Sequence, residues 1–221
     1  MRAEIQKEIP SAEIKIIVAD LVSEGKKDKI ADVLSQLGSL EGISIVVNNA
    51  GVDVLEPFTT IETEKIIDLI SINCFALAAI CHKFIPVFSE RLRKEGKKSA
   101  IINVGSVAGE MPLPLHNVYS ASKGYVGRLT KNLSLAYNEI DWLLLKPSEV
   151  STAMTCYKQQ DLLTVSAQQC VAGALRDLGR RVETNGYITH KIQSYIYSCL
   201  PASIFNYFWT RFFAPEFMGE R

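Results

Sequence analysis

A tyrosine and a lysine four residues apart carry the strongest chemical signal in the sequence, in the segment Tyr119-Ser120-Ala121-Ser122-Lys123. On a helix, positions i and i+4 share a face, so the Lys123 ammonium is expected close to the Tyr119 phenol. A nearby cation stabilises phenolate and draws a tyrosine pKa down from about 10. A tyrosine tuned in this way can exchange a proton with a carbonyl or alcohol oxygen. Ser106, at the end of an apolar run, could give the same oxygen a second hydrogen bond.

Short β-branched runs alternate along the chain with apolar residues at helical spacing. The runs predict strands over residues 14–19, 43–47, 100–104, 142–145 and 187–189. The helical spacing predicts helices over 30–37, over 62–93 with a break near Pro86, over 117–138 and over 166–178. Strands joined by helical crossovers predict an α/β fold, with a doubly wound parallel sheet between helices on both faces.

Polar and turn-forming residues follow the predicted strands. They are Asp20, Asn48–Gly51, Gly105-Ser106 and Pro147–Thr152. In parallel sheets, ligands bind beyond the carboxyl ends of the strands. The sequence therefore predicts its binding site at this edge of the sheet.

Composition and charge exclude several classes of protein. The chain has 221 residues, 48% hydrophobic and 22% charged, which fits one globular domain or one domain with an appendage. Its 24 basic and 24 acidic side chains give no electrostatic footprint for nucleic acid. The five cysteines include no C-x-x-C pair and the three histidines have no ligand-like spacing, so we expect no metal site and reduced cysteines facing the cytosol. The first ten residues hold no apolar stretch, and we expect no signal peptide.

The ordered motifs at the strand ends resemble the short-chain dehydrogenase/reductase family over residues 14–189. Ser106, Tyr119 and Lys123 match the catalytic serine, tyrosine and lysine of that family. Asn73 matches the helix asparagine that holds a water in its proton relay. The resemblance implies a Rossmann-type sheet and hydride transfer from a nicotinamide cofactor to a carbonyl, with Tyr119 giving the proton.

The same resemblance assigns residues to the cofactor. Asp20 and Leu21 resemble the pair beside the adenine ring, and Asn49, Ala50 and Gly51 belong to the N-N-A-G motif under the adenosine. Val150 and Thr152 resemble the residues that hold the nicotinamide carboxamide, while Tyr119 and Lys123 also touch the cofactor. Ser148 stands where the family usually has glycine, which could shift that loop. The cofactor implied is NADP(H), with NAD left open.

A narrower resemblance points to the branch of very-long-chain 3-oxoacyl-CoA reductases and 17β-hydroxysteroid dehydrogenases. Three segments carry it: Met111–Leu115, Thr184–His190 and Leu200-Pro201. It implies reduction of a lipid-like ketone at the cytosolic face of the endoplasmic reticulum membrane. The substrate is then a 3-oxoacyl-CoA of fatty-acid elongation or a steroid.

One family motif is missing. The sequence contains no G-x-x-x-G-x-G, the glycine turn that carries the cofactor pyrophosphate. We expect a Rossmann-type fold lacking the family's first βαβ segment, an N-terminally truncated chain and poor binding of dinucleotide. In the strand order 3-2-1-4-5-6-7 that the family implies, this removes the neighbours of the 14–19 strand. The alternative is a non-catalytic remnant that acts as an interaction protein, forming a homodimer through its long helices.

The C-terminal region has a different character. Residues 1–190 form the expected incomplete dehydrogenase domain, and 191–221 an apolar, aromatic segment. The run 192–210 contains no charged side chain and has Pro201 in its middle. Three roles remain open: a lid packed on the protein's own core, a segment at the membrane interface, or a membrane span. We predict the interface, beside the mouth of the active site, with a contribution to the acyl pocket.

Overall fold

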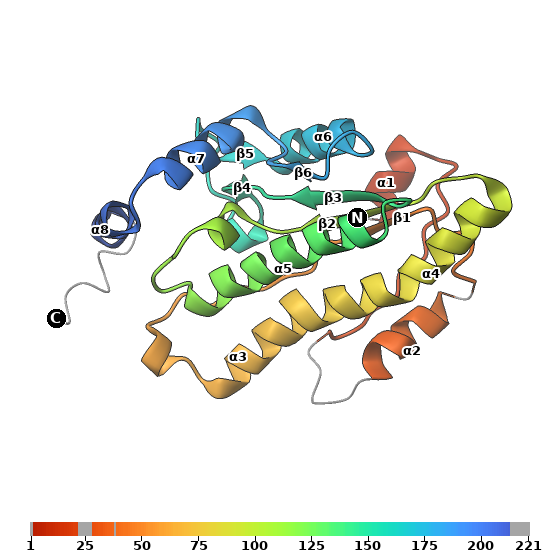
Figure 1. The fold of residues 1–221 in the computed structure, drawn as a ribbon, viewed down its shortest axis with the longest axis horizontal. Coiled ribbons are helices and arrows are strands. Elements are labelled where there is room, and N and C mark those ends of the chain that lie inside the picture. Colours follow the sequence, from red (N-terminus) through yellow and green to blue (C-terminus); the bar gives the residue numbers. More distant parts are fainter. Residues whose placement is uncertain (1, 22–27, 38, 213–221) are drawn as a thin grey trace.

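A parallel four-stranded sheet forms the centre of the molecule (Figure 1). The computed structural model describes residues 2–21, 28–37 and 39–212. The strand order is β1-β2-β3-β6, and neighbouring strands pair in parallel. The strands are β1 (Ile45–Asn48), β2 (Ala100–Val104), β3 (Asp141–Leu145) and β6 (Glu183–Thr184). The predicted strands at 43–47, 100–104 and 142–145 are confirmed to within two residues at each end.

Helices and a second, smaller sheet surround this centre. The helices are α1 (Arg2–Glu8), α2 (Asp28–Gln36), α3 (Thr63–Ile70), α4 (Leu77–Glu95), α5 (Asn117–Ala136), α6 (Ala167–Asp177), α7 (Ile188–Cys199) and α8 (Ala202–Phe212). Short 3-10 turns lie at Phe58–Thr60, Val107–Glu110 and Ala153–Thr155. Strands β4 (Val150–Ser151) and β5 (Val165–Ser166) pair in parallel as the small sheet.

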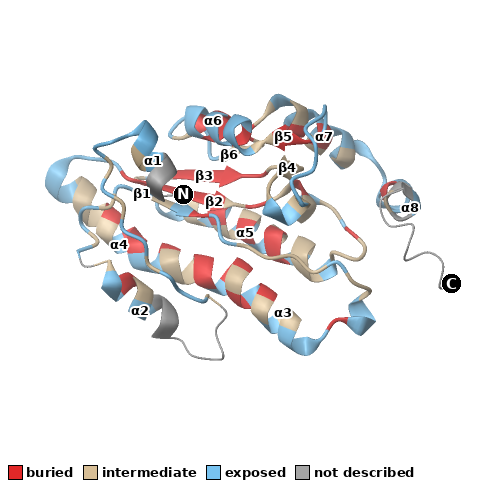
Figure 2. Ribbon diagram, turned by 180° about the vertical axis from the view of Figure 1, so that it is seen from behind, coloured by how far each residue is buried: buried red, intermediate tan, exposed pale blue. Residues whose placement is uncertain are grey.

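The sheet has an apolar core on each face, as the doubly wound prediction requires. Along β3, Trp142 and Leu144 pack into a cluster with residues of α4 and α5, such as Phe88 and Val126. Leu143 and Leu145 pack on the other face of the sheet, against Cys170 and Ala174 of α6. Successive side chains of a strand point to opposite faces, so a continuous apolar run serves both layers. Figure 1 shows α4 and α5 on one side of the sheet and α6 on the other, and Figure 2 shows β2 and β3 largely buried.

The long helical pattern at 62–93 is confirmed, but the predicted break at Pro86 is wrong. α4 runs through Pro86 without interruption. Proline removes only one backbone hydrogen bond, and the neighbouring Phe84, Ile85 and Phe88 are buried in the core. The irregularity lies earlier, in a π-helical turn over Ser71–Ala76 that joins α3 to α4. Among the described residues, the continuous helix Thr63–Glu95 is long and apolar enough to cross a bilayer, and 44% of its apolar window is buried inside the protein.

The strand predicted at residues 14–19 is absent. This segment has no regular structure, and Val18 is 93% exposed. β1 is the edge of the sheet, with Ile45 and Val47 also exposed. A strand forms only where a neighbouring strand satisfies its backbone groups, and β-branched composition alone does not supply that partner.

The last predicted strand, 187–189, is displaced. The strand β6 ends at Thr184, and α7 already begins at Ile188. Gly186, with φ of +74°, turns the chain between them. The C-terminal run 192–210 is divided at Pro201 between α7 and α8, of 12 and 11 residues. Helices of that length reach about 18 Å, too short for a hydrocarbon core of about 30 Å.

Candidate active site

Helix α5 places Tyr119 and Lys123 on one face, as their spacing predicts. The Lys123 Nζ atom lies 5.7 Å from the centre of the Tyr119 ring. Lys123 is only 6% exposed, and its ammonium donates a hydrogen bond of 2.9 Å to the carbonyl oxygen of Val104, the last residue of β2. The lysine therefore joins the helix directly to the carboxyl end of a central strand.

Ser106 reaches the same place from the end of β2. Its side chain hydrogen-bonds Tyr119 and accepts a hydrogen bond of 3.1 Å from the Ala108 N–H, which caps the turn Val107–Glu110. This turn packs very closely on α5, because a Cβ added at Gly109 would lie 2.5 Å from the carbonyl carbon of Lys123. Glycine at 109 thus sets the distance between the serine turn and the tyrosine helix.

Asn73 joins this group from the π-helical turn. Its side-chain amide pairs with both backbone groups of Val52 at 2.9 Å and donates a 3.0 Å hydrogen bond to Ser122. A Cβ added at Gly51 would lie 3.3 Å from both Asn73 Oδ1 and Lys123 Nζ. The structure therefore brings Asn73, Ser106, Tyr119 and Lys123 together. π turns occur frequently at functional sites, and the sequence pattern alone did not locate this one.

A buried polar chain supports these elements from beneath. The Asn48 amide donates to Asn103 Oδ1 at 2.8 Å, and the Asn103 amide donates to the Thr130 hydroxyl at 2.9 Å. Asn103 and Thr130 are fully buried. The chain fixes β1, β2 and α5 to one another, so the ends of these elements keep their places. The sequence signal, an asparagine within the apolar strand Ala100–Val104, was visible but was not interpreted.

Burial dominates the ionisation of the catalytic pair. It raises the pKa of Tyr119 to about 12, with a further rise from the Asp53 carboxylate, while the Ser106 hydrogen bond acts in the opposite direction. Burial also lowers the pKa of Lys123 to about 8. The predicted net lowering of the Tyr119 pKa is therefore wrong for this structure, because burial acts more strongly in the opposite direction. The lysine loses solvation in the same pocket, so its own charge is disfavoured.

The residues predicted to hold the cofactor are found in different surroundings. Gly51 lies against Asn73 and Lys123, as described, whereas Asn49 and Ala50 are exposed. Asp20 is exposed, and Leu21 packs against the apolar cluster of α4. The structure therefore does not bring the adenine-side pair into the group formed by the catalytic residues.

On the nicotinamide side, Val150 belongs to the small sheet, where it pairs with Val165. Thr152 is the N-cap residue of the 3-10 turn Ala153–Thr155, and its N–H donates a 3.0 Å hydrogen bond to the Thr155 hydroxyl. Ser148, which replaces the family glycine, donates a 2.8 Å hydrogen bond to Gln193 of α7. His190 of α7 is fully buried, and its Nε2 is hydrogen-bonded at 3.0 Å to the Glu149 carbonyl oxygen. These contacts fasten α7 to the loop that follows β3.

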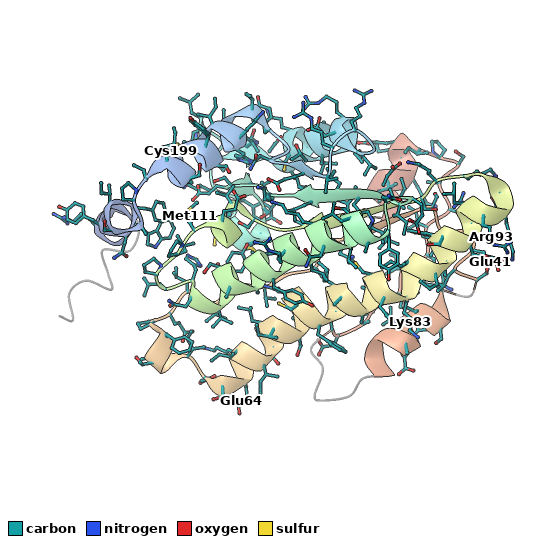
Figure 3. The ribbon with its side chains drawn as sticks, viewed as in Figure 1. Glu41, Glu64, Lys83, Arg93, Met111 and Cys199 are labelled. Carbon is teal, nitrogen blue, oxygen red and sulfur yellow. The ribbon has the colours of Figure 1, made fainter. Side chains whose placement is uncertain are left out.

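A cavity of about 790 Å³ opens beside Ser106 and Tyr119. Ser106 and Tyr119 form part of its wall, while the C-terminal helices contribute Tyr197, Phe205 and Trp209. Phe205 is buried and lies 5.4 Å from Tyr197 and 6.2 Å from Trp209, measured between ring centres. Figure 3 shows Met111, another lining residue, on the side of the molecule where α7 and α8 lie. The arrangement suits an apolar ligand with one reactive oxygen.

Sequence reasoning missed one polar pair in this wall, Asp53 with His116. Both residues line the cavity, and His116 Nδ1 lies 2.8 Å from Asp53 Oδ2. His116 precedes Tyr119 by one helical turn, but its partner Asp53 lies 63 residues away in sequence. No local spacing of residues therefore predicts the contact.

The described cysteines and candidate metal ligands form no metal-binding cluster. In the described part of the chain, no three side chains of histidine, cysteine, aspartate or glutamate gather in a way that could hold a metal ion. All five cysteines are free thiols. Burial raises the pKa of Cys81 and Cys170 to about 11, so these two are protonated packing residues at neutral pH.

The geometry can be set beside known proteins. A model of the short chain dehydrogenase family matches residues 1–163. The chain belongs to this family. Among curated relatives, the 17-beta-hydroxysteroid dehydrogenase type 3 of Danio rerio is 29% identical over 195 residues, covering 85% of this chain and 61% of that protein. The very-long-chain 3-oxoacyl-CoA reductase of Anas platyrhynchos is 30% identical over 198 residues, covering 86% of this chain and 61% of that protein. This dehydrogenase chain thus spans about three fifths of the relatives it matches.

Solved structures show the same fold. A 7beta-hydroxysteroid dehydrogenase superposes with a TM-score of 0.75 at 17% identity, covering 89% of this chain and 75% of the other. A short-chain dehydrogenase from Sphingobium yanoikuyae, solved in complex with NADPH, gives a TM-score of 0.71 at 23% identity, covering 90% and 80%. The Rossmann-like parallel sheet predicted from the sequence is confirmed.

Proposed function

We propose that the chain is the catalytic part of an NADP(H)-dependent oxidoreductase that reduces the ketone of a lipid substrate. The observation that carries this proposal is the group formed by Ser106, Tyr119, Lys123 and Asn73, in which Ser106 and Tyr119 form part of the wall of a largely apolar cavity. The names of its relatives, a 3-oxoacyl-CoA reductase and a 17-beta-hydroxysteroid dehydrogenase, support the same substrate class.

The proposed chemistry follows from protonation states. Since the Tyr119 pKa lies near 12, the phenol carries its proton at neutral pH and can donate it to a carbonyl oxygen in the reducing direction. The Ser106 hydroxyl, held beside the phenol, donates a second hydrogen bond to that oxygen. Lys123, with a pKa near 8, is mostly cationic at pH 7 and stabilises the tyrosinate as it forms. Asn73 fixes the loop at Val52 and the helix at Ser122.

The residues present fit the nicotinamide part of a dinucleotide better than its pyrophosphate. A Cβ at position 51 would lie 3.3 Å from the Lys123 Nζ atom. Because Gly51 has no Cβ, space for a ligand stays open beside Tyr119 and Lys123. Tyr119, Lys123, Val150 and Thr152 would hold the nicotinamide end, with Asp20, Leu21, Asn49 and Ala50 toward the adenosine. When bound, the nicotinamide supplies the hydride. NADP(H) is the proposed form, and the residues described here leave NAD open.

Conversion of a ketone tests this function. The purified chain is incubated with millimolar NADPH and either a long-chain 3-oxoacyl-CoA or a 3-ketosteroid or 17-ketosteroid, and the alcohol is measured by chromatography. Tyr119→Phe should abolish conversion, because the ring remains but the proton is lost. Tyr125→Phe is the matched control, since Tyr125 lies on the same helix and is 43% exposed. Conversion by Tyr119→Phe at the unaltered rate would refute the assigned chemistry.

We further propose that α7 and α8 rest on the cytosolic surface of the endoplasmic reticulum membrane. Their inner residues line the cavity, and their outer face carries exposed apolar side chains at three- to four-residue spacing. Such an apolar face beside the cavity suits the interfacial region of a bilayer. The exposed residues are Ile188, Ile192, Tyr195, Ile196, Leu200, Ile204 and Tyr207.

Vesicle binding tests the membrane proposal. The chain should float with phosphatidylcholine vesicles in a density gradient, and Ile192→Asp with Ile196→Asp should remove most of that binding. The matched control is Ile67→Asp with Ile70→Asp, which places the same two charges on exposed isoleucines of α3. Equal flotation of both variants would contradict the assignment of this face to lipid.

A second candidate function is that of a non-catalytic partner that forms a homodimer through its long helices. Its support is a group of exposed apolar side chains on α3, the π turn and α5: Ile67, Ile70, Phe75 and Tyr125. Sedimentation of the chain and of Phe75→Asp separates the cases. A dimer that Phe75→Asp dissociates, together with the absence of ketone conversion, would favour this candidate over the reductase.

A further inference from the structure

The pair formed by Asp53 and His116 is the most unusual feature of the cavity wall. His116 Nδ1 lies 2.8 Å from Asp53 Oδ2 and 3.1 Å from Oδ1, so one ring nitrogen faces both carboxylate oxygens. The two side chains are 22% and 14% exposed, and both residues line the cavity. Few ionisable groups are so deeply placed in an apolar wall without a purpose in binding or catalysis.

The carboxylate determines which nitrogen of the ring is available. Because a carboxylate only accepts hydrogen bonds, Nδ1 carries the proton, and in the neutral ring Nε2 keeps its lone pair. No hydrogen-bond partner of His116 Nε2 is found among the described residues. The ring is also held in place, with the Trp209 ring edge-on at 5.7 Å and the Tyr119 ring at 6.1 Å.

Several other polar side chains of the cavity already have partners within the protein. Ser148 donates to Gln193 at 2.8 Å, and Gln193 in turn donates to the Leu163 carbonyl oxygen at 3.2 Å. Lys158 and Glu149 form an ion pair with each other. Ser106 and Tyr119 serve the reacting oxygen. His116 therefore offers a hydrogen-bond acceptor to the cavity that no described side chain uses.

We propose that Asp53 and His116 form a second polar subsite, which accepts a hydrogen bond from a hydroxyl or an amide N–H of the substrate. This inference rests on the proposed reduction of a lipid ketone and specifies what else the substrate carries. The His116 ring lies 6.1 Å from the Tyr119 ring. The hydrogen-bond donor of the substrate therefore lies a short distance from its reacting carbonyl. The negative carboxylate behind the ring disfavours anionic groups at this position.

Binding can be measured without catalysis through Trp209. The sequence has two tryptophans, and Trp142 is buried in β3, so emission that changes with ligand reports on Trp209 in the cavity. Three medium-chain ketones serve as probes. One carries no second polar group, one carries a hydroxyl and one a secondary amide, each placed about five bonds from the carbonyl to match the 6.1 Å between the rings.

The unaltered chain should bind the hydroxyl or the amide probe roughly five- to tenfold more tightly than the plain ketone, as a net hydrogen bond provides. His116→Phe keeps an aromatic ring beside Trp209 and should erase this preference, leaving the affinity for the plain ketone within about twofold. The probe that is preferred identifies the source, a hydroxylated lipid or an amide-bearing thioester arm. His82→Phe, an exposed histidine of α4, is the matched control.

Three results would overturn the subsite. The first is equal affinity of the unaltered chain for all three probes, and the second is an undiminished preference in His116→Phe. The third is equal loss of affinity for every probe in that variant, which would assign His116 to packing. Failure of every probe to bind the unaltered chain would instead refute the lipid-ketone function, and the subsite with it.

Discussion

The region around α5 and the region before β1 differ in how far the chain itself supports their structure. Around α5, Asn73, Asn103 and Lys123 are buried and hydrogen-bonded across β1, β2, the π turn and the helix. Before β1, the β-branched segment 14–19 forms no strand, and Val18 is 93% exposed. The difference teaches that the group around Tyr119 and Lys123 is held by contacts that this chain itself supplies. Asp20 and Leu21, in contrast, follow a segment that pairs with no strand in the described structure.

Dinucleotide binding is the strongest test of this difference between the two regions. We expect the Kd of NADPH for this chain to exceed about 1 mM, because the sequence lacks the glycine turn that brings backbone N–H groups to the pyrophosphate. Cofactor fluorescence during titration gives the measurement. Saturation in the micromolar range would show that the region before β1 contributes a cofactor site in spite of its irregular structure.

Lys123→Met tests whether the residues around α5 support ketone conversion through the contacts that this chain supplies. The substitution keeps the length of the side chain but removes the cation and the hydrogen bond to the Val104 carbonyl oxygen. Ketone conversion should fall by at least about 100-fold, the scale of a general acid–base contribution. Lys131→Met, on an exposed position of the same helix, is the control. Comparable losses of ketone conversion in both variants would indicate that the substitutions disturb the helix, and would contradict a specific role of Lys123 in the reaction.

Asn103→Ala tests the buried polar chain. The Asn48 amide and the Thr130 hydroxyl would each lose one hydrogen-bond partner in the core, which should lower the free energy of unfolding by about 2–3 kcal/mol. Urea denaturation of Asn103→Ala and of the exposed control Asn132→Ala provides the comparison. A loss below about 0.5 kcal/mol, the scale of a surface substitution, would mean that the polar chain does not hold β1 and α5 together.

The buried lysine also predicts a pH dependence. The Lys123 pKa is lowered from 10.5 in the unfolded chain to about 8 in the fold, so between these values the unfolded chain binds more protons. Stability contributed by this residue therefore rises with pH from about 8 to about 10.5. The free energy of unfolding of the unaltered chain minus that of Lys123→Met should increase over this window. A difference that falls as pH rises would contradict the burial of the ammonium.

Val18→Thr should have the smallest effect. The position is exposed and outside any strand, so the free energy of unfolding should change by less than about 0.5 kcal/mol. A larger loss, measured by urea denaturation, would show that the segment 14–19 pairs with another strand in solution.

Local spacing was sufficient for the parts of the site that lie on one element. The positions of Tyr119 and Lys123 on a shared face follow from helix geometry, and the buried runs of β2 and β3 follow from their composition. Contacts between distant segments were not predictable in the same way. The partner of His116 lies 63 residues away, and the displacement of the last strand depends on the turn at Gly186. The strand predicted at residues 14–19 was wrong because a strand forms only where a neighbouring strand pairs with it, and the local sequence does not show whether that neighbour is present.

The π turn at Ser71–Ala76 has a consequence for how the chain tolerates change in length. Such a turn accommodates one residue more than an α-helical turn and so advances the register of everything after it by about 100°. Cys81, Phe84 and Phe88 of α4 point into the core only with this offset in place. Deleting a single residue between 71 and 76 would rotate all three toward solvent at once, although substitutions at the same positions would disturb only their own contacts. The helix Thr63–Glu95 is therefore far more sensitive to a lost codon than to an altered one.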